Sequence, residues 1–173
     1  MFQDWINFYF MMGSAGAGLI GLLFVVVTLT SSFDRSQASR GINYFMSPTA
    51  LHFGSVLSIS AVAMAPGLPD WATALIFGFI AVVGLAIAVR SCVGIRTMRS
   101  APEPPDWSDF WTYGCAPAAI YLGLCAASGA VWARAAWAPY AMAALVLVLL
   151  LLGIRNSWDL VTWIVPRRPG DAQ

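Results

Sequence analysis

The chain has 173 residues, of which 60% are hydrophobic and 10% charged, and its formal net charge is +1. Soluble domains have roughly 45–50% apolar and about 25% charged residues, so this composition excludes an ordinary water-soluble globule. A helix that crosses a membrane needs about 20 apolar residues. We therefore expect an all-α, polytopic transmembrane helical bundle in contact with the lipid bilayer.

Five apolar runs of suitable length predict five membrane spans. They cover residues 8–30, 44–65, 71–89, 111–131 and 137–154. The connections between them are too short to hold a soluble domain, so residues 1–173 form one membrane domain that ends in a cytoplasmic interfacial tail, 155–173. The amino end carries Asp4 but no basic residue, so we expect the first helix to be retained rather than cleaved as a signal.

The first span is rich in small residues. Gly16, Gly18 and Gly21 match the G-x-G-x-x-G dinucleotide fingerprint, which has meaning only between a strand and a helix. We therefore expect no cofactor here. Small residues four positions apart let two helices approach closely. The predicted helix-packing face, for another helix of this chain or of a partner, consists of Gly13, Ser14, Ala17, Gly18 and Gly21.

The second span contains the single histidine, His52, with Thr49, Ser55 and Ser58 at three-residue spacings. An ionisable side chain within a span is a functional candidate. The alternatives are a structural hydrogen bond to a neighbouring helix, a proton- or solute-conducting role, or a haem ligand shared with a second protomer. We favour structural packing, because no carboxylate lies within the spans to complete a proton relay.

Arg90, after the third apolar run, is another candidate within the membrane. It can extend along its own stem to the interface, or pair with Asp34 or Asp159. Arg155 and Asp159 are themselves i, i+4 neighbours. Together with Tyr121 of the fourth span, the candidate intramembrane polar site is His52, Ser55, Ser58, Tyr121 and Arg90.

An internal repeat relates the second and fourth spans. Residues 44–54 align with 113–123 with identical Tyr, Pro, Ala and Gly, and the alignment makes His52 and Tyr121 equivalent. The triplet Gly-Ile-Arg recurs at 94–96 and 153–155, where by this repeat the third and fifth spans end. We expect a 1+2+2 arrangement, with one leading helix and two parallel copies of a helical hairpin.

Aspartate and tryptophan mark the span ends. Asp4, Asp70 and Asp106 each precede a tryptophan at the start of a span, which predicts helix N-caps rather than catalytic carboxylates. The eight tryptophans fall at predicted span ends, where indole side chains collect at membrane interfaces.

Arginine predicts the orientation. Eight of the nine basic residues lie in the first connection, the third connection and the tail, and Arg134 is the exception. The positive-inside rule makes that side cytoplasmic and places the amino end and the turns at 66–70 and 133–136 outside. The absence of lysine and the many alanines favour a bacterial source, and hence the bacterial plasma (inner) membrane.

No motif points to catalysis. Cys92, Cys115 and Cys125 lack metal-ligand spacing, and HExxH, GxSxG and Walker sequences are missing. We expect no catalytic residue, metal or cofactor. The acidic, proline-rich segment 101–109 could dock a cytoplasmic partner or only lead into the fourth helix.

The segment 21–27, Gly-Leu-Leu-Phe-Val-Val-Val, and the segment 153–160, Gly-Ile-Arg-Asn-Ser-Trp-Asp-Leu, resemble small uncharacterised bacterial polytopic membrane proteins. Some members of that group carry a label as modulators of a membrane protease. The resemblance implies an inner-membrane location and no mechanism.

Two classes of function remain open. The first is a non-enzymatic membrane protein that packs with partners as a subunit or modulator of a complex, supported by the small-residue face. The second is a small oligomeric channel or transporter with a path lined by His52 and serines. The expected partners are copies of the chain or other membrane proteins, and no nucleic acid.

Overall fold

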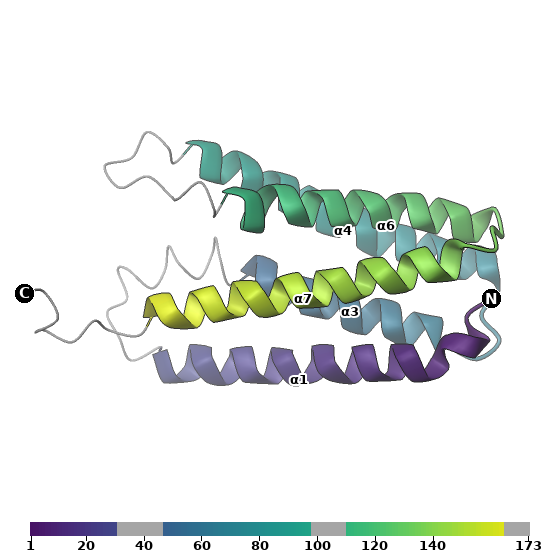
Figure 1. Cartoon of the computed structure of the whole chain (residues 1–173), viewed down its shortest axis with the longest axis horizontal. Helices are drawn as coiled ribbons and strands as arrows, with labels where there is room; N and C mark the ends of the chain where they lie inside the picture. Colours follow the sequence, from purple (N-terminus) through teal and green to yellow (C-terminus); the bar gives the residue numbers. More distant parts are fainter. Residues whose placement is uncertain (31–46, 98–109, 165–173) are drawn as a thin grey trace, which may run out of the picture.

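The computed structural model describes residues 1–30, 47–97 and 110–164 (Figure 1). Within these ranges the chain is helical and has no strand, which confirms the predicted all-α class. The elements in order are η1 (Gln3–Trp5), α1 (Ile6–Thr30), α3 (Ser47–Ala63), α4 (Asp70–Thr97), the π-helical turn η4 (Phe110–Cys115), α6 (Ala116–Trp132) and α7 (Ala138–Ile164).

Four segments are long and apolar enough to cross a membrane. They are Gln3–Val26, Asp70–Arg96, Phe110–Trp132 and Ala138–Asp159. The predicted second span corresponds to α3, an apolar helix of 17 residues, and the start of that prediction, 44–46, lies outside the described residues. The transmembrane character expected from composition is thus supported at four of the five predicted positions.

Two helices extend well beyond their apolar runs. The predicted third span ends at 89, whereas α4 continues to Thr97. The predicted fifth span ends at 154, whereas α7 continues to Ile164, so the first part of the predicted tail is helical. Hydropathy marks only the apolar stretch, while a helix continues until a stop signal, and the first prolines after these runs are Pro102 and Pro166.

The helices lie alongside one another in an elongated bundle (Figure 1). The most extensive pairings are α1 with α3 and α4 with α6, and α7 contacts α1, α3 and α6. The amino terminus, the α3–α4 turn and the α6–α7 turn share one end of the bundle, as the predicted topology requires. We call this the turn end, and the opposite end, where α4 and α7 finish, the arginine end.

Mostly small side chains line the buried face of α4. The inward positions of α4 are Ala74, Phe77, Ala81, Gly84 and Ala88, which recur at alternating steps of three and four residues. This spacing keeps one face of a helix on its partner. Small residues at such a seam let the backbones approach, which drives helix association where no water is present.

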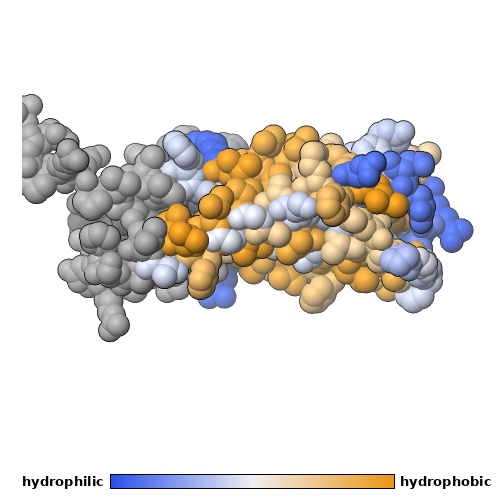
Figure 2. Space-filling model, turned by 90° about the horizontal axis from the view of Figure 1, so that it is seen from below, coloured by the Kyte–Doolittle hydropathy of each residue, from blue (hydrophilic) through white to orange (hydrophobic). Residues whose placement is uncertain are grey.

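The face of the bundle drawn in Figure 2 is largely apolar between the two ends. Large side chains such as Phe79 (71% exposed) and Phe10 (64% exposed) point away from the bundle. Tryptophans are exposed at both ends, with Trp71, Trp132 and Trp137 at the turn end and Trp111 and Trp158 at the arginine end. This distribution is typical of helices surrounded by lipid and bounded by two interfaces.

Candidate functional site

The structure brings His52 and Tyr121 into direct contact inside the bundle. His52 Nδ1 on α3 lies 3.0 Å from the Tyr121 hydroxyl on α6, and the ring centroids are 5.6 Å apart. Both side chains are buried, at 1% and 0% exposure. The two positions that the predicted repeat would make equivalent therefore meet inside the helix bundle.

Ser55 completes a three-residue cluster. Its Oγ also lies 3.0 Å from the Tyr121 hydroxyl and is buried. A phenol has one proton, so it donates to one neighbour and accepts from the other. Either Tyr121 donates to His52 Nδ1 and accepts from Ser55, or it accepts from a protonated Nδ1 and donates to Ser55. In both arrangements a single hydroxyl joins α3 to α6.

Gly84 on α4 makes room for this hydroxyl bridge. A Cβ at Gly84 would lie 2.1 Å from Cε1 of Tyr121, well inside van der Waals contact. Gly153 on α7 plays the same part for Phe53, whose Cε1 would lie 2.6 Å from an added Cβ. Each of these glycines thus makes room for one aromatic ring. Gly84 sets how closely α4 approaches α6, and Gly153 sets how closely α7 approaches α3.

Polar groups continue along the buried side of α3. Thr49 and Ser60, on either side of His52, are 0% and 1% exposed. Among the described residues, His52 Nε2, Ser60 Oγ and the hydroxyl of Tyr9 on α1 are buried without a hydrogen-bond partner. From Thr49 to Ser60 this polar row extends about 16 Å along the helix, at ~1.5 Å per residue.

Two predicted members of the polar site lie elsewhere. Ser58 is exposed on the outer side of α3, because six residues turn a helix by about 600°, which leaves Ser58 about 120° from His52. Arg90 is exposed on α4, roughly 200° around the helix from Ala88 on the packed face. It does not join His52, Ser55 and Tyr121, so including Ser58 and Arg90 in this cluster was wrong.

Asp34 and Asp159 are the acidic residues predicted as possible partners of Arg90. Asp159 lies 3.9 Å from Arg155, as the i, i+4 spacing predicts. Asp34 lies outside the described residues. The exposed side chain of Arg90 at the arginine end agrees with extension toward the interface.

The predicted helix-packing face of α1 is divided between the interior and the surface. Gly13 is buried against α3, where a Cβ would lie 3.1 Å from Ser60 Cβ, and Gly16 meets the Phe53 carbonyl in the same way at 3.2 Å. The remaining members are exposed: Ser14, Ala17, Gly18 and Gly21. At Gly18 and Gly21 nothing lies within 4 Å of an added Cβ.

Sequence reasoning missed a clasp at the arginine end. Tyr113 in η4 donates its hydroxyl proton to the Asn156 carbonyl at 3.0 Å, and Asn156 Nδ2 donates to the Thr112 carbonyl at 3.2 Å. Asn156 on α7 is fully buried. Asn156 lies in the segment predicted to be an interfacial tail, where an asparagine gives no signal of a buried contact. Only the continuation of α7 through this segment places it against η4.

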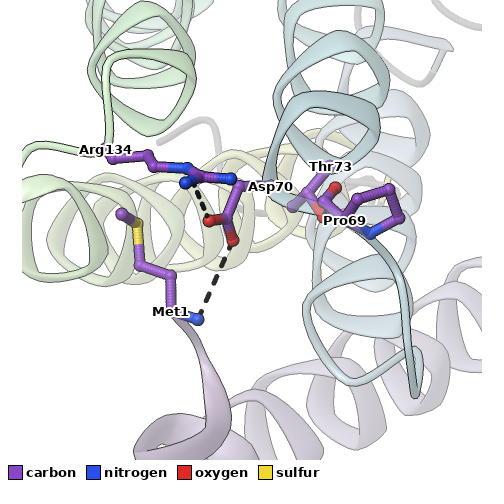
Figure 3. A network of polar contacts seen from close by, with 5 residues as sticks. All are labelled: Met1, Pro69, Asp70, Thr73 and Arg134. Carbon is purple, nitrogen blue, oxygen red and sulfur yellow. Dashed lines mark hydrogen bonds and ion pairs between the residues drawn. The ribbon is translucent and has the colours of Figure 1, made fainter.

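The turn end is held by an ion-pair network (Figure 3). Arg134 Nε lies 3.3 Å from Asp70 Oδ2, and the Met1 amino group lies 3.9 Å from Oδ1. Arg134, the exception among the arginines, is thus neutralised by a carboxylate at its own end. A shallow pocket of about 210 Å³ opens beside Asp70, but the charge on its wall is already paired.

The predicted aspartate caps need correction. Both Ala72 and Thr73 donate their backbone N–H to the Pro69 carbonyl, so Pro69 precedes α4 and Asp70 lies within its first turn. Asp4 likewise lies inside η1, which has no side-chain cap. Both carboxylates still face the positive ends of helix dipoles. Asp106 lies outside the described residues.

Within the described ranges, no group of three or more His, Cys, Asp or Glu side chains could hold a metal ion. The bundle interior holds a hydrogen-bonded histidine–tyrosine–serine cluster between α3 and α6. Comparisons with family models, with curated proteins and with solved structures found no match to this chain.

Proposed function

We propose that the chain is a multi-pass protein of the bacterial inner membrane that has no enzymatic activity and packs with partners as a subunit or modulator of a membrane complex. The observation that carries this proposal is the exposed small-residue face of α1, Ser14, Ala17, Gly18 and Gly21. It lies in a helix that is long and apolar enough to cross a membrane.

This face carries only small side chains, which close packing of a second helix requires. Larger side chains border it along the same helix, including Phe10 (64% exposed) and Leu22 (63% exposed). The surface on this side shows a pale, weakly polar strip within the apolar surface (Figure 2). A shallow strip of this kind gains packing contacts from a helix more readily than from disordered lipid tails.

The topology belongs to the same proposal. We include α3 as the fifth span: its 17 residues extend about 26 Å, close to the roughly 30 Å of the hydrocarbon core, and it contacts α1, α4 and α7. The arginine end, with Arg90, Arg96 and Arg155, would be cytoplasmic, and the turn end outside. Single cysteines placed at the turn end or at the arginine end can be treated in intact cells with a maleimide that does not cross the membrane. Only cysteines at the turn end should react if this orientation is correct.

Native mass spectrometry in a mild detergent tests the partner proposal. The wild type should travel with a second copy or with another membrane protein, and Gly18→Leu should release it as a single chain. The matched control is Gly129→Leu on α6, because Gly129 is also exposed with nothing within 4 Å. A wild type that is always a lone chain, or equal behaviour of both variants, would refute the proposal.

A second candidate function rests on the polar row of α3. His52 Nε2, Ser60 Oγ and the Tyr9 hydroxyl are buried polar groups that water or a transported solute would satisfy. This favours a small oligomeric channel or transporter as the alternative. Flux into proteoliposomes should then fall for His52→Ala and Ser60→Ala, while Ser58→Ala on the outer side of α3 keeps the wild-type rate.

A further inference from the structure

Two cysteines that are far apart in sequence meet at the arginine end. Cys92 on α4 and Cys115 at the end of η4 have sulfur atoms 3.9 Å apart. Both side chains are partly exposed at the surface of the bundle. The third cysteine, Cys125, lies ten residues further along, on α6.

A close backbone approach holds the two thiols together. A Cβ at Gly114 would lie 3.1 Å from Cys92 Cα and 3.2 Å from its Sγ, so a glycine is what allows η4 to lie directly on α4. On its other side η4 is tied to α7 by the hydrogen bonds of Tyr113 and Asn156. The dithiol is therefore fixed between two anchored elements rather than brought together by chance rotation of side chains.

We propose that Cys92 and Cys115 form a reversible dithiol–disulfide site that is oxidised by hydroperoxides. One thiolate attacks a peroxide oxygen, the O–O bond breaks, and an alcohol or water leaves with the formation of a sulfenic acid. The second sulfur attacks this sulfenic sulfur, the S–S bond forms and water leaves. Two thiols thus supply the two electrons that reduce one hydroperoxide, and an external thiol restores the reduced pair.

The disulfide would act on the packing of three helices. The sulfur atoms must approach from 3.9 Å to about 2.05 Å, a step that side-chain torsions and a small shift of η4 can supply. The bond would then join α4 covalently to η4, whose Tyr113 already holds α7. Oxidation would in this way lock the arginine end of the bundle without reaching the α1 face.

Counting free thiols on the full chain in detergent tests this site. The protein is treated with hydrogen peroxide, alkylated with N-ethylmaleimide after unfolding, and weighed intact. The reduced chain should take up three adducts, one for each cysteine, and the oxidised chain only one. Dithiothreitol should restore all three, and the oxidised protein should give a linked pair of peptides that contain Cys92 and Cys115.

Single-cysteine variants provide the controls. In Cys125→Ser both remaining adducts should disappear on oxidation, whereas Cys92→Ser and Cys115→Ser should keep both of theirs. Peptide mapping of the wild type gives a readout that does not depend on whether these variants fold. Three adducts after peroxide, a linkage that involves Cys125, or a disulfide between two chains would each overturn the proposal.

Discussion

Gly84→Ala is expected to destabilise the bundle through a single ring. In the structure an added Cβ would lie 2.1 Å from Cε1 and 2.4 Å from Cδ1 and Cζ of Tyr121. The ring cannot simply rotate away, because it is fully buried and its hydroxyl is held by His52 and Ser55 at 3.0 Å each. Making room for the methyl group therefore requires α4 to move away from α6 and the Tyr121 hydroxyl to leave its partners.

The expected loss follows from these two changes. Overpacking a close-packed interior costs about 1–3 kcal/mol. Loss of the two hydrogen bonds of the Tyr121 hydroxyl adds about 0.5–1.5 kcal/mol for each bond. Alanine is the better helix former by about 1 kcal/mol, which offsets part of the loss. We expect a net loss of stability of about 1–5 kcal/mol.

Thermal unfolding in detergent, followed by the helical circular dichroism signal, measures this effect. In a chain of this size each kcal/mol of lost stability lowers the unfolding midpoint by ~2–4 °C. A loss in the middle of the expected range of about 1–5 kcal/mol should therefore lower the midpoint by at least several degrees. Gly18→Ala is the matched control, since it replaces a glycine of α1 with open space around it and should leave the midpoint unchanged or slightly raised.

A double-mutant cycle identifies the ring as the cause. In a Tyr121→Ala background the clash partner is gone, so Gly84→Ala should cost little or nothing. Two results would contradict the close approach of α4 and α6. One is an unfolding midpoint of Gly84→Ala equal to that of the wild type. The other is a loss of stability that is the same with and without the Tyr121 ring.

Three further substitutions test other contacts. Tyr121→Phe leaves His52 and Ser55 without their shared partner and should cost about 2–4 kcal/mol, measured as a lower unfolding midpoint; a change below about 0.5 kcal/mol would show that the hydroxyl bridge is not formed. Asn156→Leu removes the donor to the Thr112 carbonyl inside the arginine-end clasp and should speed amide exchange in η4, while exchange at the turn end stays unchanged. Arg134→Gly loses an exposed ion pair but relieves a left-handed residue at φ 57°, so the free energy of unfolding should stay close to that of the wild type; a fall of more than about 2 kcal/mol would assign the Asp70 pair a larger role than exposed pairs normally have.

The polar site shows how far sequence reasoning reached. His52 and Tyr121 could be singled out because an ionisable or phenolic group within a span is rare and because the predicted repeat aligns the two positions. Their hydrogen bond could not be predicted, since it depends on the rotation of α3 and α6 about their own axes. Ser58 was assigned to the wrong side for a simpler reason, because repeated three-residue steps fall progressively behind a 3.6-residue turn.

Small residues posed a different problem. The glycines of α1 were noticed because they are dense, yet only Gly13 and its neighbour Gly16 are used within the bundle. The glycines that set the closest approaches, Gly84 and Gly153, stand alone in long apolar runs. One available signal was the row Ala74, Phe77, Ala81, Gly84 and Ala88 along α4, which recurs at alternating steps of three and four and is mostly small.

The amino-acid sequence by itself determined the helical class, the apolar segments and which connections share an end of the bundle. These features follow from local quantities, namely hydropathy over about 20 residues and the placement of charged and aromatic side chains along the chain. Only the tertiary structure decided that Cys92 meets Cys115, that Asn156 closes on η4, and that α1 leaves most of its small-residue face uncovered. Each of these contacts depends on how the helices are rotated about their axes and which helices pair. Close packing of small residues selects both. A nearly uniform apolar sequence does not show which face of a helix will be used.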